Sequence, residues 1–204
     1  VLFRSGVMPT GGGKSLCYEL PALLLPGMTL VVSPLISLMK DQVMALRNAG
    51  IPAGCINSSM SLDELRETYR DARYGAYKLL YVAPERLLTD GFCSLAQELE
   101  IPLVAVDEAH CISQWGQDFR PSYLKIVEFL QRLPRRPAVA AFTATATAQV
   151  RADIIRILQL HEPETVVTGF DRPNLRFEVL RPKDKRTALL QLLSERRDKS
   201  GIVY

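Results

Sequence analysis

The sequence predicts an α/β fold of three layers, with a mainly parallel central sheet flanked by helices. Short apolar runs rich in β-branched residues alternate with helix-prone segments along the 204 residues. Polar residues suited to chemistry directly follow several of these runs, as they do at the carboxyl edge of parallel sheets. A glycine-rich loop at residues 8–15 (MPTGGGKS) also joins the first apolar run to a helix-prone segment.

This glycine-rich loop has the composition of a triphosphate-binding loop. Consecutive glycines let several backbone N–H groups turn inward around a phosphate, and the helix that follows directs its positive end toward the anion. The lysine can reach the outer phosphates and the serine hydroxyl can ligate Mg²⁺. Met8 replaces the first glycine of the Walker A pattern, and a plain glycine-rich turn is the alternative. The expected binding residues are Thr10, Gly11, Gly12, Gly13, Lys14 and Ser15.

The other elements follow from apolar pattern and capping signals. The opening run should supply a strand before the loop, but residues 4–6 (RSG) interrupt it, and residues 1–5 are a candidate foreign leader. Helices are expected over residues 14–24, 37–49 and 61–74, the last opened by a capping box of Ser61 and Glu64. Buried strands are expected over residues 29–32, 53–56, 78–82, 103–106, 139–142 and 165–167.

A change of composition near residue 169 predicts a domain boundary. The first domain covers residues 1–168, a turn-rich connector covers residues 169–180, and residues 181–204 begin a second domain that the chain does not complete. In this last part we expect strands over residues 176–180 and 201–204, with a helix over residues 183–197 between them.

Composition narrows the class of protein. With 48% hydrophobic and 23% charged residues the chain can bury one full-sized core. No apolar run approaches the roughly 18 residues of a membrane span, so we expect no membrane partner and a cytoplasmic location. Four scattered cysteines and two histidines argue against disulfides and zinc. The net charge of +3 is compatible with a polyanionic partner.

A second chemical motif, residues 106–110 (VDEAH), ends one of the predicted strands. A phosphate-loop enzyme holds Mg²⁺ with an acidic residue at this position, so Asp107 is the expected metal ligand. Glu108 can orient and deprotonate an attacking water. The alternative is a solvated turn.

A third motif, residues 141–147 (AFTATAT), ends the next strand. Its hydroxyls, including those of Thr143 and Thr145, could bond to the acidic motif and report the state of the nucleotide. The alternative is a plain strand followed by a threonine helix cap.

Together the motifs resemble the superfamily 2 DNA helicases of the RecQ family. The most specific stretch is residues 107–116 (DEAHCISQWG), continued by residues 118–121 (DFRP) as an aromatic-rich loop. The resemblance extends in the same order over residues 8–24, 32–43, 81–87, 106–123, 142–147 and 170–175.

The resemblance implies an ATP-driven motor of two RecA-like domains, of which this chain has the first and the start of the second. Such motors use ATP and Mg²⁺, move 3′ to 5′ along single-stranded DNA, and unwind duplex DNA in repair and recombination. The implied location is cytoplasmic, associated with the nucleoid in a bacterium. No oligomeric state is implied.

The resemblance also assigns roles to residues. Lys14 and Ser15 would bind phosphates and Mg²⁺, Asp107 the metal, and Glu108 would be the catalytic base. For Trp115 and Phe119 ordinary loop packing is the alternative, and for Lys40 a solvated helix face. Coupling and DNA contact would fall to His110, Gln114, Trp115, Phe119, Arg120, Thr143, Thr145 and Lys40.

Three departures from the family pattern bear on activity. Gln117 stands where the family usually has histidine. The family's adenine-recognition motif would precede this sequence, and its arginine finger, which contributes about 10³- to 10⁵-fold in rate, would follow it. We therefore expect the fragment alone to be nearly inactive. Another superfamily 2 ATPase, acting on RNA or as a translocase, and a non-catalytic nucleotide-binding module remain the alternatives.

Overall fold

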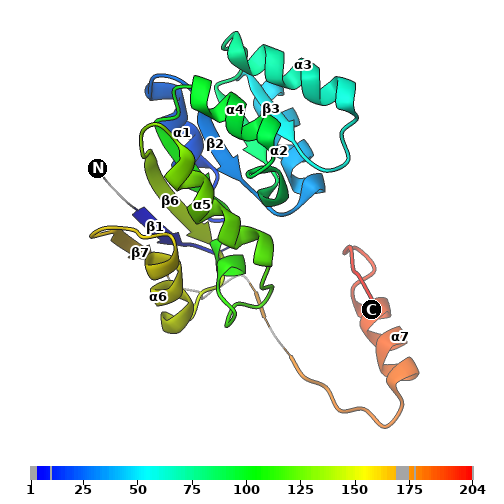
Figure 1. Cartoon of the computed structure of the whole chain (residues 1–204). Coiled ribbons are helices and arrows are strands. Elements are labelled where there is room, and N and C mark those ends of the chain that lie inside the picture. The colour runs from blue at the N-terminus through cyan, green and yellow to red at the C-terminus, as the bar shows by residue number, and fades with distance from the viewer. Residues whose placement is uncertain (1–3, 10, 169–174, 177, 204) are drawn as a thin grey trace. The chain divides into compact units, whose positions relative to one another are not determined.

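The computed structural model describes residues 4–9, 11–168, 175–176 and 178–203. It separates into two compact units, residues 1–170 and 171–204, each of which is described by itself. In the larger unit, seven strands of the described residues form one sheet with the order β3-β4-β2-β5-β6-β1-β7. Every recorded pairing is parallel, and helices flank the sheet (Figure 1). The predicted three-layer α/β fold is confirmed.

The elements that the sequence predicted in the larger unit agree closely with the expected ranges, whereas the helices over residues 90–98, 125–132 and 148–157 had no predicted range. The strands are β1 (Arg4–Val7), β2 (Thr29–Val32), β3 (Ala53–Ile56), β4 (Leu79–Val82), β5 (Leu103–Val106), β6 (Ala138–Thr143) and β7 (Glu164–Val167). The helices are α1 (Leu16–Leu24), α2 (Ile36–Asn48), α3 (Leu62–Arg73), α4 (Asp90–Glu98), α5 (Lys125–Arg132), α6 (Ala148–Ile157) and α7 (Lys185–Glu195).

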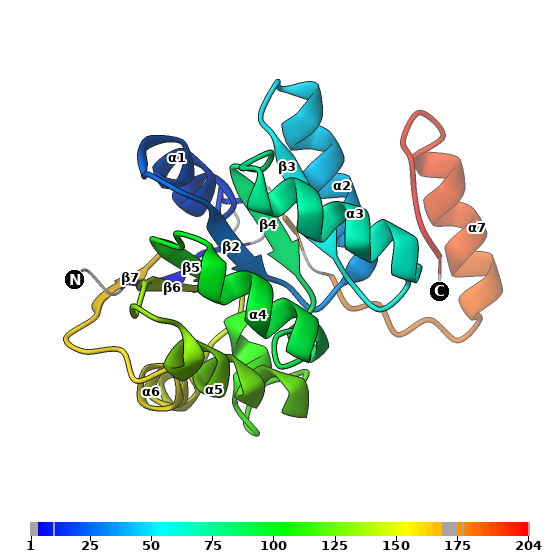
Figure 2. The same ribbon diagram turned by 45° about the horizontal axis from the view of Figure 1, so that its top comes forward.

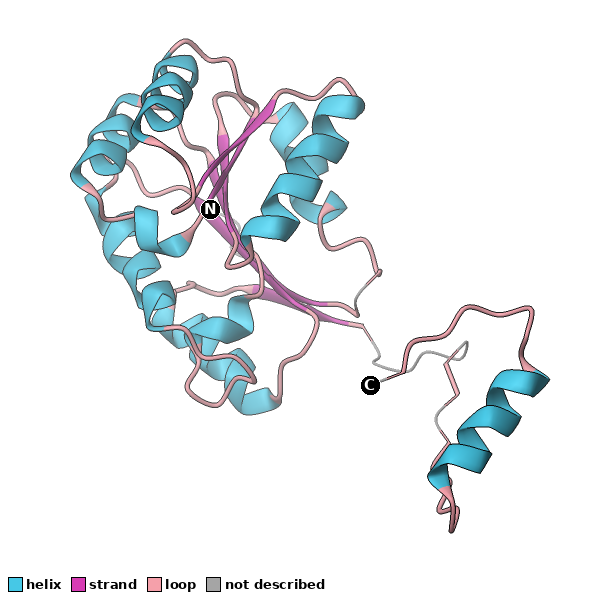
Figure 3. Ribbon diagram, turned by 90° about the vertical axis from the view of Figure 1, so that its right-hand side faces the viewer, coloured by secondary structure: helices cyan, strands magenta, loops and turns pink. Residues whose placement is uncertain are grey.

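Two apolar clusters, one on each face of the sheet, form the core. On one face α1 and α2 pack against the strands through Tyr18 and Met39. On the other face α3, α4, α5 and α6 contribute a larger cluster that includes Phe92 and Phe129. Figures 2 and 3 show this division, with the sheet seen nearly edge-on in Figure 3. Because both faces are covered there, the central strands β2, β4 and β5 are buried along their whole length, which is why their short β-rich runs were readable in the sequence.

The strand β1 forms where the sequence indicated an interruption. Arg4 and Ser5 pair on one side with β6 and on the other with β7. Gly6 lies against the ring of Phe142, and a Cβ atom there would come within 3.0 Å of that ring. The polar run is tolerated because the backbone hydrogen bonds to two neighbours and the small residues Ser5 and Gly6 fit a crowded position.

The carboxyl edge of the sheet gathers the predicted motifs. The loop after β1 starts beside the end of β6, where the Met8 amide donates to the Thr143 carbonyl oxygen at 3.0 Å. The acidic motif after β5 starts beside the end of β2, where the Asp107 amide donates to the Val32 carbonyl oxygen at 2.9 Å. Since β5, β6 and β1 are neighbours in the sheet, the three motifs lie together.

The smaller unit contains α7, as expected from the sequence. Its N-cap Asp184 accepts from the backbone amides of Arg186 and Thr187, at 2.9 and 3.4 Å. The two strands predicted around this helix were wrong for the residues that the structure describes, 176, 178–180 and 201–203, which form no strand. A short apolar run becomes a strand only when a neighbour pairs with it, and no such neighbour is present among the described residues of this unit.

Candidate nucleotide site and aromatic loop

The phosphate loop is shaped by its glycines. Gly11 and Gly13 have φ values of 82° and 80°, in the left-handed region that glycine adopts without strain. The Gly12 amide donates to the Pro9 carbonyl oxygen at 2.9 Å, and a Cβ atom on Gly12 would lie 2.9 Å from that same oxygen. The expected residue Thr10 lies outside the described residues. The loop therefore has the backbone freedom that phosphate binding requires.

Two polar side chains of this loop have weak protein contacts. The Lys14 ammonium lies 3.4 Å from the Met8 carbonyl oxygen. The Ser15 hydroxyl accepts from Nε2 of Gln42 at 3.3 Å. Gln42 reaches the loop from α2, so the helix after β2 contacts the expected Mg²⁺ ligand directly. Both loop side chains are half-buried and available to a ligand.

Asp107 is a buried carboxylate at the end of β5, 4% exposed. Burial and the nearby Glu108 charge raise its pKa to about 6, while the Glu108 amide, Lys14 and His110 act in the opposite direction. The Glu108 amide donates to Oδ1 of Asp107 at 3.0 Å. A buried carboxylate whose pKa is raised is stabilised by any cation that binds beside it.

Glu108 and His110 connect the acidic motif to β6. Glu108 has a left-handed backbone with φ 45°, which for a residue with a side chain costs about 1 kcal/mol. Its Oε2 lies 3.3 Å from Nδ1 of His110. The same Nδ1 lies 2.9 Å from the hydroxyl oxygen of Thr143. His110 is the first cause of a lowered pKa at Glu108, which is therefore ionised at neutral pH.

The hydrogen bonds of Thr143 fix the proton on His110. The Thr143 hydroxyl donates to the Thr145 carbonyl oxygen at 3.2 Å and accepts from the Thr145 amide at 3.2 Å. Its remaining contact, with His110, is one in which Nδ1 donates. The side chains of Cys111 and Glu108 raise the pKa of His110 to about 9, so the imidazolium form predominates at pH 7. The expected bond between the threonine motif and the acidic motif is present.

The aromatic loop, residues 113–120, is exposed in its middle and anchored at its ends. Trp115 is 69% exposed and Phe119 is half-buried. At the far end the Arg120 amide donates to the Cys111 carbonyl oxygen at 2.9 Å. The Arg120 guanidinium donates to Asp118 at 2.7 and 2.9 Å and to the Pro34 carbonyl oxygen at 3.1 Å.

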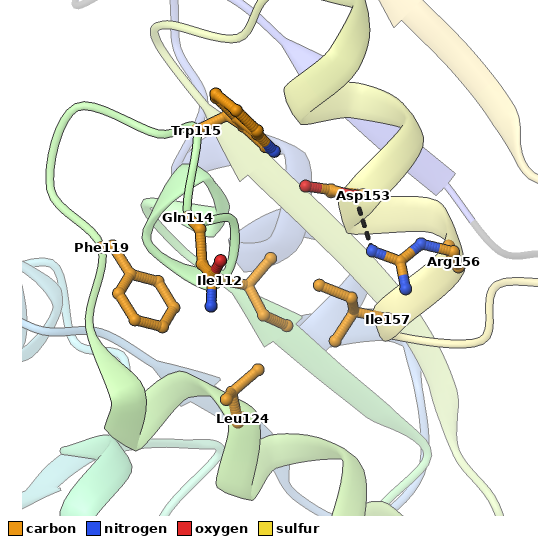
Figure 4. Close-up of a pocket in the computed structure, with 8 residues that line it drawn as sticks. All are labelled: Ile112, Gln114, Trp115, Phe119, Leu124, Asp153, Arg156 and Ile157. Carbon is orange, nitrogen blue, oxygen red and sulfur yellow. Dashed lines mark hydrogen bonds and ion pairs between the residues drawn. The ribbon is translucent and has the colours of Figure 1, made fainter.

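Of the predicted residues that the structure describes, most lie together and Lys40 lies apart from them. Gln114, Trp115 and Phe119 line a pocket of ≈ 230 Å³ between the loop and α6 (Figure 4). Lys40 is an exposed residue of α2 whose charge acts on Cys55 and Glu64, on the β3 side of the sheet. Among the residues that the structure describes, neither of these two interactions joins Lys40 to the aromatic loop.

Two contributors had no predicted role. The Tyr123 hydroxyl is buried and donates to the Asp107 carbonyl oxygen at 2.8 Å. Asp153 on α6 accepts from the Ser113 hydroxyl at 2.7 Å, across 40 positions of sequence. Tyr123 follows the motif closely enough to have been considered, whereas nothing in the local pattern distinguishes Asp153 from other polar residues of an amphipathic helix.

Two curated proteins are similar to this chain in sequence. The RecQ ATP-dependent DNA helicase of Bacillus subtilis (strain 168) is 50% identical over 198 residues, covering 97% of this chain and 34% of that protein. The RecQ helicase of Pasteurella multocida (strain Pm70) is 45% identical over 198 residues, covering 97% of this chain and 31% of its own length. The chain thus spans about a third of these relatives.

Solved structures and a family model show the fold and the family. A hypothetical ATP-dependent RNA helicase from Sulfolobus tokodaii superposes with a TM-score of 0.64 at 20% identity, covering 82% of this chain and 48% of the other. The Pyrococcus furiosus Hef helicase domain gives 0.61 at 20% identity, with coverages of 81% and 35%. The DEAD/DEAH box helicase model matches residues 4–154. The chain therefore belongs to the DEAD/DEAH box helicase family, of which it carries the first motor domain.

Proposed function

We propose that this chain is the first motor domain of a RecQ-type DNA helicase, which couples ATP hydrolysis to 3′-to-5′ movement along single-stranded DNA and to duplex unwinding. The observation that carries the proposal is the position of His110, which contacts Glu108 and Thr143 through its ring and accepts at its carbonyl oxygen from the Ser113 amide, where the aromatic loop begins. It gives a physical route by which contact at Trp115 can alter the position of Glu108. The protein would work in the cytoplasm, on the nucleoid in a bacterium.

The residues present fit ATP with Mg²⁺. The Ser15 hydroxyl and the Asp107 carboxylate are hard oxygen ligands of the kind that Mg²⁺ prefers. Asp107 is buried with a pKa of about 6, so a divalent cation would compensate a charge that the protein leaves partly uncompensated. When bound, the metal supplies charge neutralisation at the phosphates. Lys14 and the glycine loop would bind and orient the phosphate chain.

Glu108 would act on the attacking water. It is ionised at neutral pH and partly exposed, so it can accept a hydrogen bond from water and then its proton. His110 holds the Glu108 carboxylate through Nδ1 and is itself fixed by Thr143. A displacement of the segment 110–113 would therefore move the base. Alone, the 204 residues would bind ATP and hydrolyse it slowly, because the arginine finger of the family belongs to the second motor domain.

The test is ATP hydrolysis by a protein with both motor domains complete, with and without single-stranded DNA. We expect strong stimulation by DNA, lost in Trp115→Ala and in Glu108→Gln. In Trp115→Ala the DNA-free rate should remain, whereas Glu108→Gln should lose both rates. Nucleotide binding without DNA-stimulated turnover would contradict the proposal and indicate a nucleotide-binding module. Stimulation by RNA in preference to DNA would assign a different substrate to the motor.

A further inference from the structure

The start of the aromatic loop is tied to α6 by a short chain of hydrogen bonds. The Ser113 hydroxyl donates to Oδ2 of Asp153 at 2.7 Å. The Ser113 hydroxyl oxygen in turn accepts from the Trp115 backbone amide at 3.1 Å. Ser113 is fully buried, so its hydroxyl is held by the Asp153 carboxylate and in turn holds the Trp115 amide. Figure 4 shows Trp115 from the loop and Asp153 from α6 beside each other in the lining of the same pocket.

Asp153 is held in position from its own helix. Its Oδ1 accepts from Nη2 of Arg156 at 2.7 Å, one turn further along α6. The Arg156 side chain is 72% exposed and that of Asp153 is 17% exposed. Arg156 first, and then Ser113, lower the pKa of Asp153, so the carboxylate is ionised at neutral pH and both its oxygens are used.

The contact between Ser113 and Asp153 completes a closed path of contacts that runs through α6, the threonine motif and His110. The helix α6 begins after Thr147, whose hydroxyl accepts from the Val150 amide at 3.3 Å, and Thr147 ends the same segment that starts at Thr143. Thr143 contacts His110, and the short helical turn Ala109–Ile112 leads from His110 to Ser113. The loop start is thus joined to the threonine motif by two routes, through His110 and through Asp153 with α6.

The turn after Ser113 leaves little room to move independently. The Gly116 amide donates to the Ser113 carbonyl oxygen at 2.9 Å, and a Cβ atom on Gly116 would lie 2.2 Å from the His110 carbonyl oxygen. Residues 113–116 therefore pack as a tight turn onto the acidic motif. A change in how Ser113 is held would be passed to Trp115 and to His110 together.

We propose that Asp153 is a positioning residue of the motor, holding the aromatic loop through Ser113 so that DNA contact at Trp115 is transmitted to the threonine motif through α6. This inference rests on the proposed function for its consequence in turnover, but its structural part concerns the loop alone. An alternative is that Asp153 only forms a surface ion pair with Arg156. In that case Ser113 would be a bystander, and removing the carboxylate would leave the loop unchanged.

The structural part is tested by fluorescence of the whole 204-residue chain, because Trp115 is its single tryptophan. In Asp153→Ala we expect a lower steady-state anisotropy of Trp115 and easier quenching by acrylamide. Asp153→Asn, which keeps an acceptor for Ser113, should restore most of both signals. Asp63→Ala is the matched control, since Asp63 also pairs with an arginine three positions later, at 3.2 Å, on the distant helix α3.

The functional part is tested in the protein with both motor domains complete. Asp153→Ala should raise the concentration of single-stranded DNA needed for half-maximal ATPase stimulation about tenfold, as expected for one hydrogen bond to a charged group. Asp153→Asn should recover most of that loss. Arg156→Gln should change it less than Asp153→Ala does, because Ser113 keeps its acceptor.

The outcomes separate the two proposals. If the wild-type protein shows no DNA stimulation, the proposed function fails while the fluorescence comparison still decides the role of Asp153. If stimulation is present and Asp153→Ala behaves like Asp63→Ala in both measurements, the positioning role is overturned. If Asp153→Ala does not fold, Ser113→Ala makes the same test from the other partner. An Arg156→Gln effect as large as that of Asp153→Ala would support the surface ion pair instead.

Discussion

The phosphate loop and the acidic-aromatic segment, residues 107–120, are built in opposite ways. In the phosphate loop two glycines are left-handed, and the Lys14 ammonium has a long contact of 3.4 Å with a carbonyl oxygen. In the acidic-aromatic segment the side chains of His110, Ser113 and Arg120 are bound to partners on β6, α6 and the loop after β2. One is conformationally permissive and the other is fixed.

This difference assigns different tasks to the two regions. A loop that must wrap phosphate oxygens gains from free N–H groups and a mobile cation, and its final geometry depends on the anion. A base that must be moved by a second ligand gains from rigid connections, because a loosely held base would not follow the motion of a distant loop. Substitutions in the loop should therefore affect ligand binding, and substitutions in the segment should affect stability and coupling.

Lys14→Ala should give the largest effect on ATP turnover and should separate that effect most clearly from stability. We expect ATP turnover of the two-domain protein to fall by about 10³-fold, as for removal of a main electrostatic contact to the transition state. The unfolding free energy of the 204-residue chain should change by less than about 0.5 kcal/mol, because Lys14 contributes little to packing. Steady-state ATPase and urea unfolding measure the two. A large loss of stability would contradict the division of tasks.

Asp107→Asn should stabilise the ligand-free chain. The folded pKa of Asp107 is about 6 and its ordinary value is 3.8, so the ionised form is disfavoured by folding and wild-type stability falls as pH rises through this range. The substitution should therefore increase the free energy of unfolding by at most about 3 kcal/mol above pH 7, and leave it unchanged below about pH 4.

Urea unfolding of both proteins at pH 4, 6 and 8 measures this effect. Mg²⁺ with ADP should make the wild-type protein more stable than Asp107→Asn at pH 8, because the cation favours the Asp107 carboxylate. Equal stabilities of the two proteins at pH 8 without Mg²⁺ would show that the charge is already compensated inside the protein.

Gly116→Ala should destabilise the acidic-aromatic segment through crowding. The added Cβ atom would lie 2.2 Å from the His110 carbonyl oxygen, so the turn must shift, at a cost of about 1 to 3 kcal/mol. Gly11→Ala is the matched loop variant, in open space but with φ 82°, and should cost about 1 kcal/mol in strain. Thermal unfolding compares them. A larger loss of stability in Gly11→Ala than in Gly116→Ala would contradict the proposed contrast between the two regions.

Thr147→Ala should give the smallest effect on stability, about 1 kcal/mol, because it removes the hydroxyl that caps α6. Ser61→Ala removes a comparable cap from α3, far from the site. The two variants should therefore be similar in unfolding experiments. Only Thr147→Ala should weaken stimulation of the ATPase by single-stranded DNA, since α6 carries Asp153. Equal stimulation in both variants would argue against a role for α6 in coupling.

Much of the fold could be predicted because parallel strands buried on both faces are apolar throughout. The ranges for β2, β3 and β5 were correct to the residue. The capping box of Ser61 and Glu64 was also correct, since both of its hydrogen bonds are present. These features depend on residues close in sequence, where propensity and pattern carry the information.

The errors came from interactions between distant segments. The interruption expected at residues 4–6 is overcome because β1 lies between β6 and β7, and the strands expected over residues 176–180 and 201–204 lack a described neighbour to pair with. The contact of Asp153 with Ser113 spans 40 positions and leaves no local pattern. The chemical motifs were readable one by one, but the closed path of contacts that joins them was visible only in the fold.

The most direct test of the contrast is amide hydrogen exchange of the 204-residue chain, with and without Mg²⁺ and a non-hydrolysable ATP analogue. Without nucleotide, we predict fast exchange for Gly11, Gly13 and Lys14, and slow exchange for Cys111 and Arg120, whose amides donate to backbone carbonyl oxygens at 2.9 Å. With nucleotide the loop amides should become protected and the others should change little. Equal and rapid exchange in both regions without nucleotide would contradict the account.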